Sequence, residues 1–153
     1  MAYRYHRARI LVFQALFEAE FGLIPAPDAL GRSAAFAHLP APEQAYARTL
    51  VDGVGAHRAD LDAIITRFAP IFPVAQLSVV DRTVLRIALC ELLFNNAAVP
   101  PGTVINEAVE LAKTFGSDSS RRFVNGVLGA VSRAGVGVAT GPDAETEDSD
   151  GPV

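Results

Sequence analysis

The apolar residues of the chain are densest between residues 79 and 94. Six of them recur at the three-and-four spacing of an α-helix: Val84, Leu85, Ala88, Leu89, Leu92 and Leu93. Further apolar side chains widen this face until Arg86 and Glu91 are nearly the only polar residues. A stretch this short cannot span a bilayer, which requires roughly 20 apolar residues. The pattern therefore predicts a central buried helix, around which the rest of the chain packs.

The start of this central helix also carries a local signal. Ser78 precedes Asp81 by three residues, a spacing that lets the hydroxyl accept a bond from a free helix amide. The Asp81 carboxylate would then lie at the positive end of the helix dipole. We expect the helix to begin at this point.

Similar spacing predicts helices over residues 4–21, 43–68 and 104–115, and a weaker one over 29–39. Gly53 and Gly55 would either bend the 43–68 segment or allow a close helix contact. We expect Gly116 to end a helix in the left-handed conformation. Ser117 or Asp118 would then cap a last helix, whose buried stripe is Val124, Val127, Leu128 and Val131. No strand pattern of any length appears, so the expected fold is all-α.

Charge is distributed unevenly along the 153 residues. The net charge is −4, from 17 acidic and 13 basic residues. Five acids lie near the C-terminal end: Asp143, Glu145, Glu147, Asp148 and Asp150. Without these five, 12 acids face 13 bases, so the rest of the chain is close to neutral. We predict a helical domain over residues 1–135 and a disordered acidic tail over 136–153 that repels non-specific nucleic acid.

The sequence contains no recognisable catalytic or metal-binding pattern. The three histidines, His6, His38 and His57, lie on separate segments without a ligand spacing. Nucleophile and dinucleotide motifs are also absent, so we expect neither an enzyme nor a bound cofactor. Cys90 has no possible disulfide partner and is predicted to pack in the core of a cytoplasmic protein. Glu107 and Glu110 are expected to form ordinary surface ion pairs.

The N-terminal segment has the composition of a nucleic-acid-binding surface. It interleaves cations with aromatic rings: Tyr3, Arg4, Tyr5, His6, Arg7 and Arg9. Guanidinium groups make charge-assisted bonds to phosphates, and rings offer faces on which unpaired bases stack. The alternative is a solvated helix start with two anchoring tyrosines. The residues alone leave both interpretations open.

Four separated segments resemble the NusB family of transcription antitermination and termination factors. Near the start these are Arg7-Ala8-Arg9 and Gln14-Ala15-Leu16-Phe17, and the central helix supplies the stretch from Asp81 to Leu92. The longest match runs from Val104 to Gly116 and continues in Arg122-Phe123-Val124-Asn125-Gly126-Val127-Leu128. These motifs occur in the family's order over residues 4–133.

The resemblance implies a compact bundle of about seven helices in two packed subdomains. It also implies binding of boxA RNA in ribosomal RNA leaders, together with the ribosomal protein NusE, within an RNA polymerase antitermination complex. Carried to matching positions, the RNA-binding residues are Arg4, Arg7, Arg9, Arg82, Arg122 and Phe123. The partner-binding residues are Asp81, Arg82 and Phe17.

Several alternatives accompany this interpretation. Phe123 lies one position off the buried stripe of the last helix, so it is either a base-stacking ring or an edge-of-core residue. The arginine-rich start is thinner than the family's, with Tyr5 and His6 at positions that are often basic, which predicts weaker and less salt-sensitive RNA binding. The other functional classes are a protein-only helical interaction module and an accessory RNA-binding subunit for ribosomal RNA modification. Homodimerisation through an apolar face is also left open.

Overall fold

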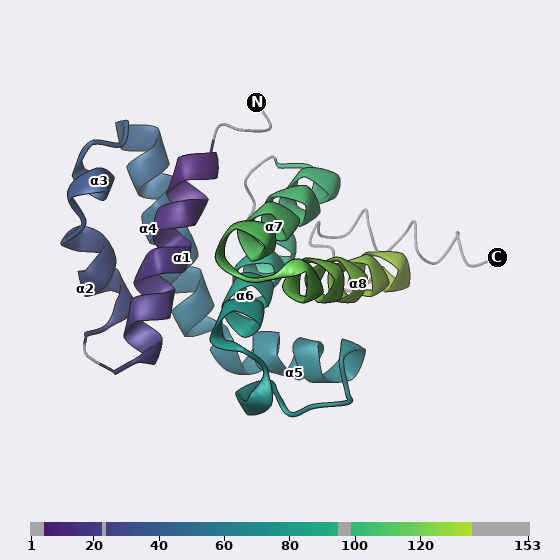
Figure 1. Cartoon of the computed structure of the whole chain (residues 1–153). Coiled ribbons are helices and arrows are strands. Elements are labelled where there is room, and N and C mark those ends of the chain that lie inside the picture. The colour runs from purple at the N-terminus through teal and green to yellow at the C-terminus, as the bar shows by residue number, and fades with distance from the viewer. Residues whose placement is uncertain (1–4, 23, 95–98, 136–153) are drawn as a thin grey trace.

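The computed structural model describes residues 5–22, 24–94 and 99–135, and within these ranges all regular structure is helical (Figure 1). The α-helices are α1 (His6–Glu20), α2 (Ala26–Gly31), α3 (Ala34–Ala37), α4 (Ala41–Ala56), α5 (Arg58–Phe68), α6 (Val79–Phe94), α7 (Pro101–Phe115) and α8 (Asp118–Ala134), with a 3-10 turn, η1 (Val74–Gln76). The all-α prediction is confirmed. Arg4 and the predicted tail at 136–153 lie outside the described residues.

The helices form two packed groups, as the family resemblance implied. In the first, α1 packs against α2 and α4; in the second, α6 packs against α5, α7 and α8. Helix α6 also contacts both α1 and α4, so it joins the two groups (Figure 1). The chain is therefore organised around α6, as its apolar pattern predicted.

Helix α6 covers the predicted residues 79–94, and its burial is continuous from Thr83 to Leu92. The Ser78 Oγ accepts a hydrogen bond of 3.0 Å from the Asp81 amide, which confirms the predicted capping interaction. Arg86 and Glu91, the two polar positions of this helix, are themselves 5% and 6% exposed. Buried charges need ionic partners, so these two residues indicate contacts that the local pattern did not reveal.

The predicted helix over 43–68 is in fact two helices, α4 and α5, which meet at His57. Gly53 lies inside α4 and allows a close contact: a Cβ atom there would come within 2.8 Å of Cys90 Sγ on α6. The glycine therefore serves helix packing rather than a bend. Cys90 is buried, as predicted, and burial followed by the Glu91 charge raises the pKa of its thiol to about 12.

Other local predictions need correction. The expected helix over 29–39 is replaced by the short helices α2 and α3. Gly116 ends α7 with a φ of −119°, so its left-handed conformation was predicted wrongly; Gly135, after α8, adopts it with a φ of 68°. Ser117 caps α8 by accepting a bond of 3.2 Å from the Ser120 amide. The predicted buried stripe of α8 is confirmed.

Candidate nucleic-acid interface

The first turn of α1 presents an exposed cation and contains no acidic residue. The N-terminus of a helix attracts anions, because the helix dipole adds partial positive charge there. Arg7 projects from this turn with its side chain 66% exposed, and within the described ranges its one ion pair is with Glu43, at 3.7 Å. Its guanidinium is therefore accessible to a phosphate.

Arg9, two residues later, belongs to the protein interior. Its Nε and Nη2 atoms each donate to the Glu91 carboxylate at 2.8 Å, and its Nη1 lies 3.5 Å from Glu107. Burial disfavours its charge, but the bond and charge of Glu91 keep the pKa of Arg9 above its ordinary value. Only 1% of Arg9 is exposed and its donors are bonded within the chain, so a contact with RNA would require these bonds to break. The contact of Arg9 with RNA stays a prediction.

Tyr46 of α4 completes this buried cluster and connects it to the start of α1. Its hydroxyl donates a very short hydrogen bond to Glu91, and burial, reinforced by the Glu91 charge, raises the pKa of Tyr46. Its ring stacks in parallel on that of Tyr5, with centroids 3.9 Å apart. His6 Nδ1 donates to Glu107 at 2.8 Å. The interior thus fixes the turn from which Arg7 projects.

Glu107 was expected to form a surface ion pair, and the structure corrects this. The residue is 5% exposed and faces His6 and Arg9 of α1. On α7, Val104, Ala108, Leu111 and Ala112 are buried with Glu107, whereas Ile105, Val109 and Phe115 are only partly buried.

The start of α8 supplies the second cationic element. Arg122 is exposed, and Arg121 lies 3.9 Å from Asp118 in a loose surface pair. Phe123 is half-buried and packs against the core, which agrees with its position one residue off the buried stripe. Its partial exposure leaves ring surface beside Arg122, so the edge-of-core and base-stacking interpretations are compatible.

Aromatic packing brings the start of α8 close to the middle of α1. Phe115, at the end of α7, stacks on Phe13 of α1 with ring centroids 4.5 Å apart, and α8 begins three residues later. Arg7 lies about two turns before Phe13 on the same helix. The exposed cations of α1 and α8 therefore lie on two helices that are linked through the Phe13–Phe115 contact at the end of α7.

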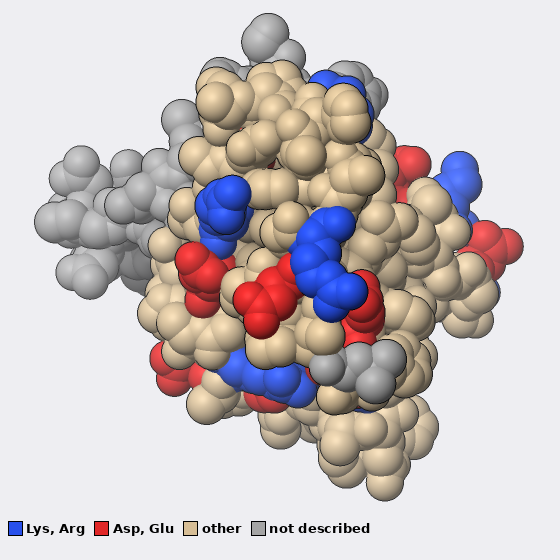
Figure 2. All heavy atoms as spheres, turned by 90° about the vertical axis from the view of Figure 1, so that its left-hand side faces the viewer, with Lys and Arg blue, Asp and Glu red and all other residues tan. Residues whose placement is uncertain are grey.

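The opposite side of the first helix group does not offer a comparable surface. Figure 2 shows the side of the molecule where α2 and α3 lie, with blue and red side chains alternating among the described residues. Mixed charge of this kind weakens attraction for a polyanion. The candidate interface is therefore the surface near the starts of α1 and α8.

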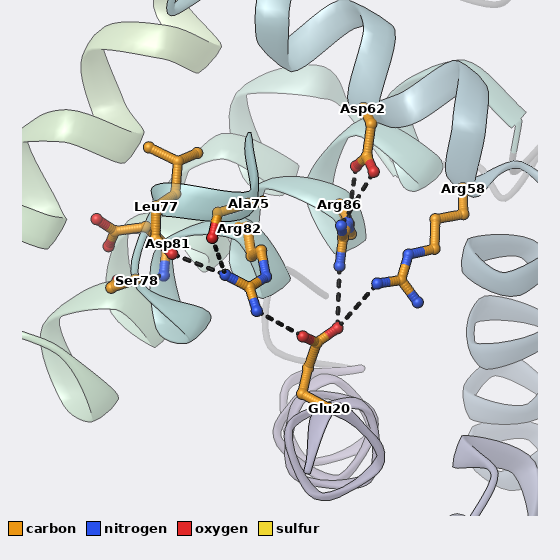
Figure 3. Close-up of polar contacts among 9 residues, drawn as sticks. All are labelled: Glu20, Arg58, Asp62, Ala75, Leu77, Ser78, Asp81, Arg82 and Arg86. Atoms are coloured by element: carbon orange, nitrogen blue, oxygen red, sulfur yellow. Dashed lines mark hydrogen bonds and ion pairs between the residues drawn. The ribbon is translucent and has the colours of Figure 1, made fainter. Parts of the chain in front are cut away.

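Arg82, in the first turn of α6, lies beside Glu20 at the C-terminal end of α1. Glu20 is about 20 Å along α1 from Arg7, at 1.5 Å per residue. Its Nη2 donates to Glu20 at 2.7 Å, while its Nη1 donates to the Leu77 carbonyl oxygen at 2.7 Å (Figure 3). The guanidinium thus joins α1 to the segment before α6. These contacts compete with the predicted phosphate contact, since they use donors on both terminal nitrogens.

Glu20 is the centre of a larger charge cluster that sequence reasoning missed. It also receives Arg58 at 3.2 Å and Arg86 at 3.1 Å, and Arg86 makes a two-pronged pair with Asp62 at 2.8 and 3.0 Å (Figure 3). Burial raises the pKa of Glu20, but the Arg82 bond and the three guanidinium charges outweigh it, so the net shift is downward. The buried Arg86 in an otherwise apolar helix was the available sequence signal.

The predicted partner-binding residues lie near this cluster or along α1. Asp81 is partly exposed, yet its Oδ1 atom is buried and has no hydrogen-bond partner within the described part of the chain. Phe17 is half-buried between Phe13 and the 60% exposed Phe21, with centroid distances of 5.6 and 5.1 Å. An unsatisfied acceptor and a partly exposed aromatic row both suit a protein contact.

Among the described residues, no group of three or more His, Cys, Asp or Glu side chains is arranged to hold a metal ion. None of the described helices is both long and apolar enough to cross a membrane.

Comparison with known proteins accounts for the whole described fold. The NusB family profile matches residues 6–133. Transcription antitermination protein NusB of Roseiflexus castenholzii is 46% identical over 132 residues, covering 86% of this chain and 93% of that protein. The protein of the same name from Chloroflexus aggregans is 48% identical over 132 residues, covering 86% and 88%.

Solved structures agree with the sequence comparison. T. maritima NusB superposes with a TM-score of 0.78 at 32% identity, covering 94% of this chain and 96% of that one. A crystal structure of antitermination factors NusB and NusE in complex with dsRNA gives a TM-score of 0.77 at 28% identity, covering 88% and 98%. With the profile matching nearly all described residues and relatives above 40% identity, the chain belongs to the NusB family.

Proposed function

We propose that the protein is an RNA-binding transcription antitermination factor. It binds boxA RNA of ribosomal RNA leaders together with NusE, as part of an RNA polymerase antitermination complex in the cytoplasm. It acts by binding and assembly rather than by catalysis. The observation that carries this proposal is the match over 88% of the chain to a NusB that was solved with NusE and RNA.

The surface described above supports the RNA-binding part. Arg7 of α1 and Arg122 of α8 are exposed cations, and Phe123 adds a partly exposed ring. Phosphate contacts supply affinity, and stacking adds about 1–3 kcal/mol per base. Arg4 remains a predicted phosphate contact. Asp81, at the start of α6, and Phe17, on α1, are proposed to face NusE.

A binding experiment tests the proposal directly. Labelled boxA RNA and a scrambled RNA of equal composition are titrated with the protein, each with and without NusE, over a series of salt concentrations. We expect tighter boxA binding that NusE strengthens, with a log–log salt slope of about −0.7 for each phosphate neutralised on a single strand. Equal, weak binding to both RNAs with retained NusE binding would instead identify a protein-only interaction module.

A further inference from the structure

We propose that Glu20 is a positioning residue for the NusE-binding surface, acting through Arg82 on the segment that carries Asp81. The inference rests on the proposed function. Glu20 is the last residue of α1, and its side chain is 12% exposed. Its two carboxylate oxygens bind different arginines: Oε1 accepts a hydrogen bond from Arg82 at 2.7 Å, whereas Oε2 faces Arg58 and Arg86 (Figure 3).

Arg82 connects Glu20 to the segment that precedes α6. One terminal nitrogen, Nη2, bonds Glu20, and the other, Nη1, donates to the carbonyl oxygen of Leu77 at 2.7 Å and lies 3.4 Å from that of Ala75. Only the planar fork of arginine can bridge a carboxylate on one element and carbonyls on another in this way. The Glu20–Arg82 pair therefore holds η1 and the start of α6 against the end of α1.

Asp81 is the residue that this arrangement presents. Its backbone amide is fixed by Ser78 Oγ, and it directly precedes the anchored Arg82. Its Oδ1 atom is buried without a partner among the described residues. An acceptor without a donor is unfavourable, and because Asp81 as a whole is partly exposed, its carboxylate can gain a donor from a docking protein. Such a gain requires the carboxylate to be held in place before the partner arrives.

The same cluster disfavours a role in RNA binding. Three guanidinium groups, from Arg58, Arg82 and Arg86, face the carboxylate of Glu20, and Arg86 also pairs with Asp62, so two of the three positive charges are balanced within the cluster. A phosphate would have to displace Glu20 from Arg82 and approach two carboxylates. We therefore assign this end of α1 to the protein partner, and the Arg7 end to RNA.

The experiment uses Glu20→Gln, which keeps the shape but removes the charge, and Arg82→Lys, which keeps the charge but removes the fork. Arg86 retains its two-pronged pair with Asp62 in both variants, so we expect the fold to persist. Glu18→Gln, at an exposed position on the same helix, and Arg32→Lys, at an exposed position just after α2, are matched controls. NusE affinity and boxA affinity without NusE are measured for each protein, with hydrogen exchange of the amides over residues 77–82.

We expect both test variants to bind NusE about tenfold more weakly, with faster exchange at 77–82 and boxA affinity unchanged within about twofold. The controls should match the wild type. NusE affinity equal to wild type in Glu20→Gln would overturn the inference. So would tighter boxA binding with a steeper salt slope, because Arg82 would then be an RNA contact. Equal losses of NusE and RNA affinity with a lower melting temperature would indicate a merely structural role. Failure of the proposed function is distinct, since the wild type itself would then show no preference for boxA RNA over the scrambled RNA.

Discussion

Arg9 and Glu91 form a two-pronged ion pair inside the protein, although 82 positions separate them in the chain. Both side chains are only 2% exposed, and Tyr46 and Glu107 complete the shell around them. The pair joins the start of α1 to the far end of α6. It therefore fixes the position of the first turn of α1, from which Arg7 projects.

Arg9→Ala should destabilise the fold strongly while Arg7→Ala should not. Removing one partner of a buried pair leaves an uncompensated charge and costs about 3–5 kcal/mol. An exposed pair such as Arg7 with Glu43 is worth about 0–1 kcal/mol. Urea unfolding of the two variants gives both free energies. Equal, small losses would show that Arg9 is solvated in solution and support its predicted contact with RNA.

This pair also marks the boundary of what the sequence can predict. Helix α6 was predicted to its terminal residues, because apolar spacing and the Ser78 cap are local signals. The burial of Arg9 could not be predicted from the sequence around it, because it depends on the carboxylate of Glu91, 82 positions away. Glu107 was misassigned for the same reason. The break at His57 was missed because no proline marks it.

RNA binding should depend on Arg7 and Arg122 separately. Each Arg→Ala substitution removes one phosphate contact, so the log–log salt slope for a single strand should become shallower by about 0.7. Both side chains are exposed, and the fold should remain intact. Arg133→Ala is the matched control, because this exposed arginine occupies the last turn of α8, at the opposite end from Arg122. RNA affinities equal to wild type for both variants would remove the proposed RNA surface.

The charge cluster at Glu20 should make part of the stability depend on pH. The pKa of Glu20 is lowered in the folded protein, so its contribution is fully present above the unfolded value, near 4.3, and is lost as the pH falls through the folded pKa. Wild type should therefore exceed Glu20→Gln in unfolding free energy at pH 7, and the difference should shrink below about pH 4.5. Urea unfolding at pH 7, 5, 4 and 3 measures it. A difference that stays constant down to pH 3 would contradict the assignment.

Gly53→Ala should destabilise the protein, although alanine normally favours a helix by up to about 1 kcal/mol. The new Cβ would lie 2.8 Å from the buried Sγ of Cys90, and overpacking of this kind costs about 1–3 kcal/mol. Gly126→Ala is the control, because a Cβ added to this exposed glycine of α8 would meet nothing within 4 Å, so the substitution should gain stability.

In a Cys90→Ala background the clash is removed, so Gly53→Ala should become neutral or stabilising. A double-mutant cycle by urea unfolding measures this coupling, and a zero coupling energy would mean that α4 and α6 do not approach as closely as described.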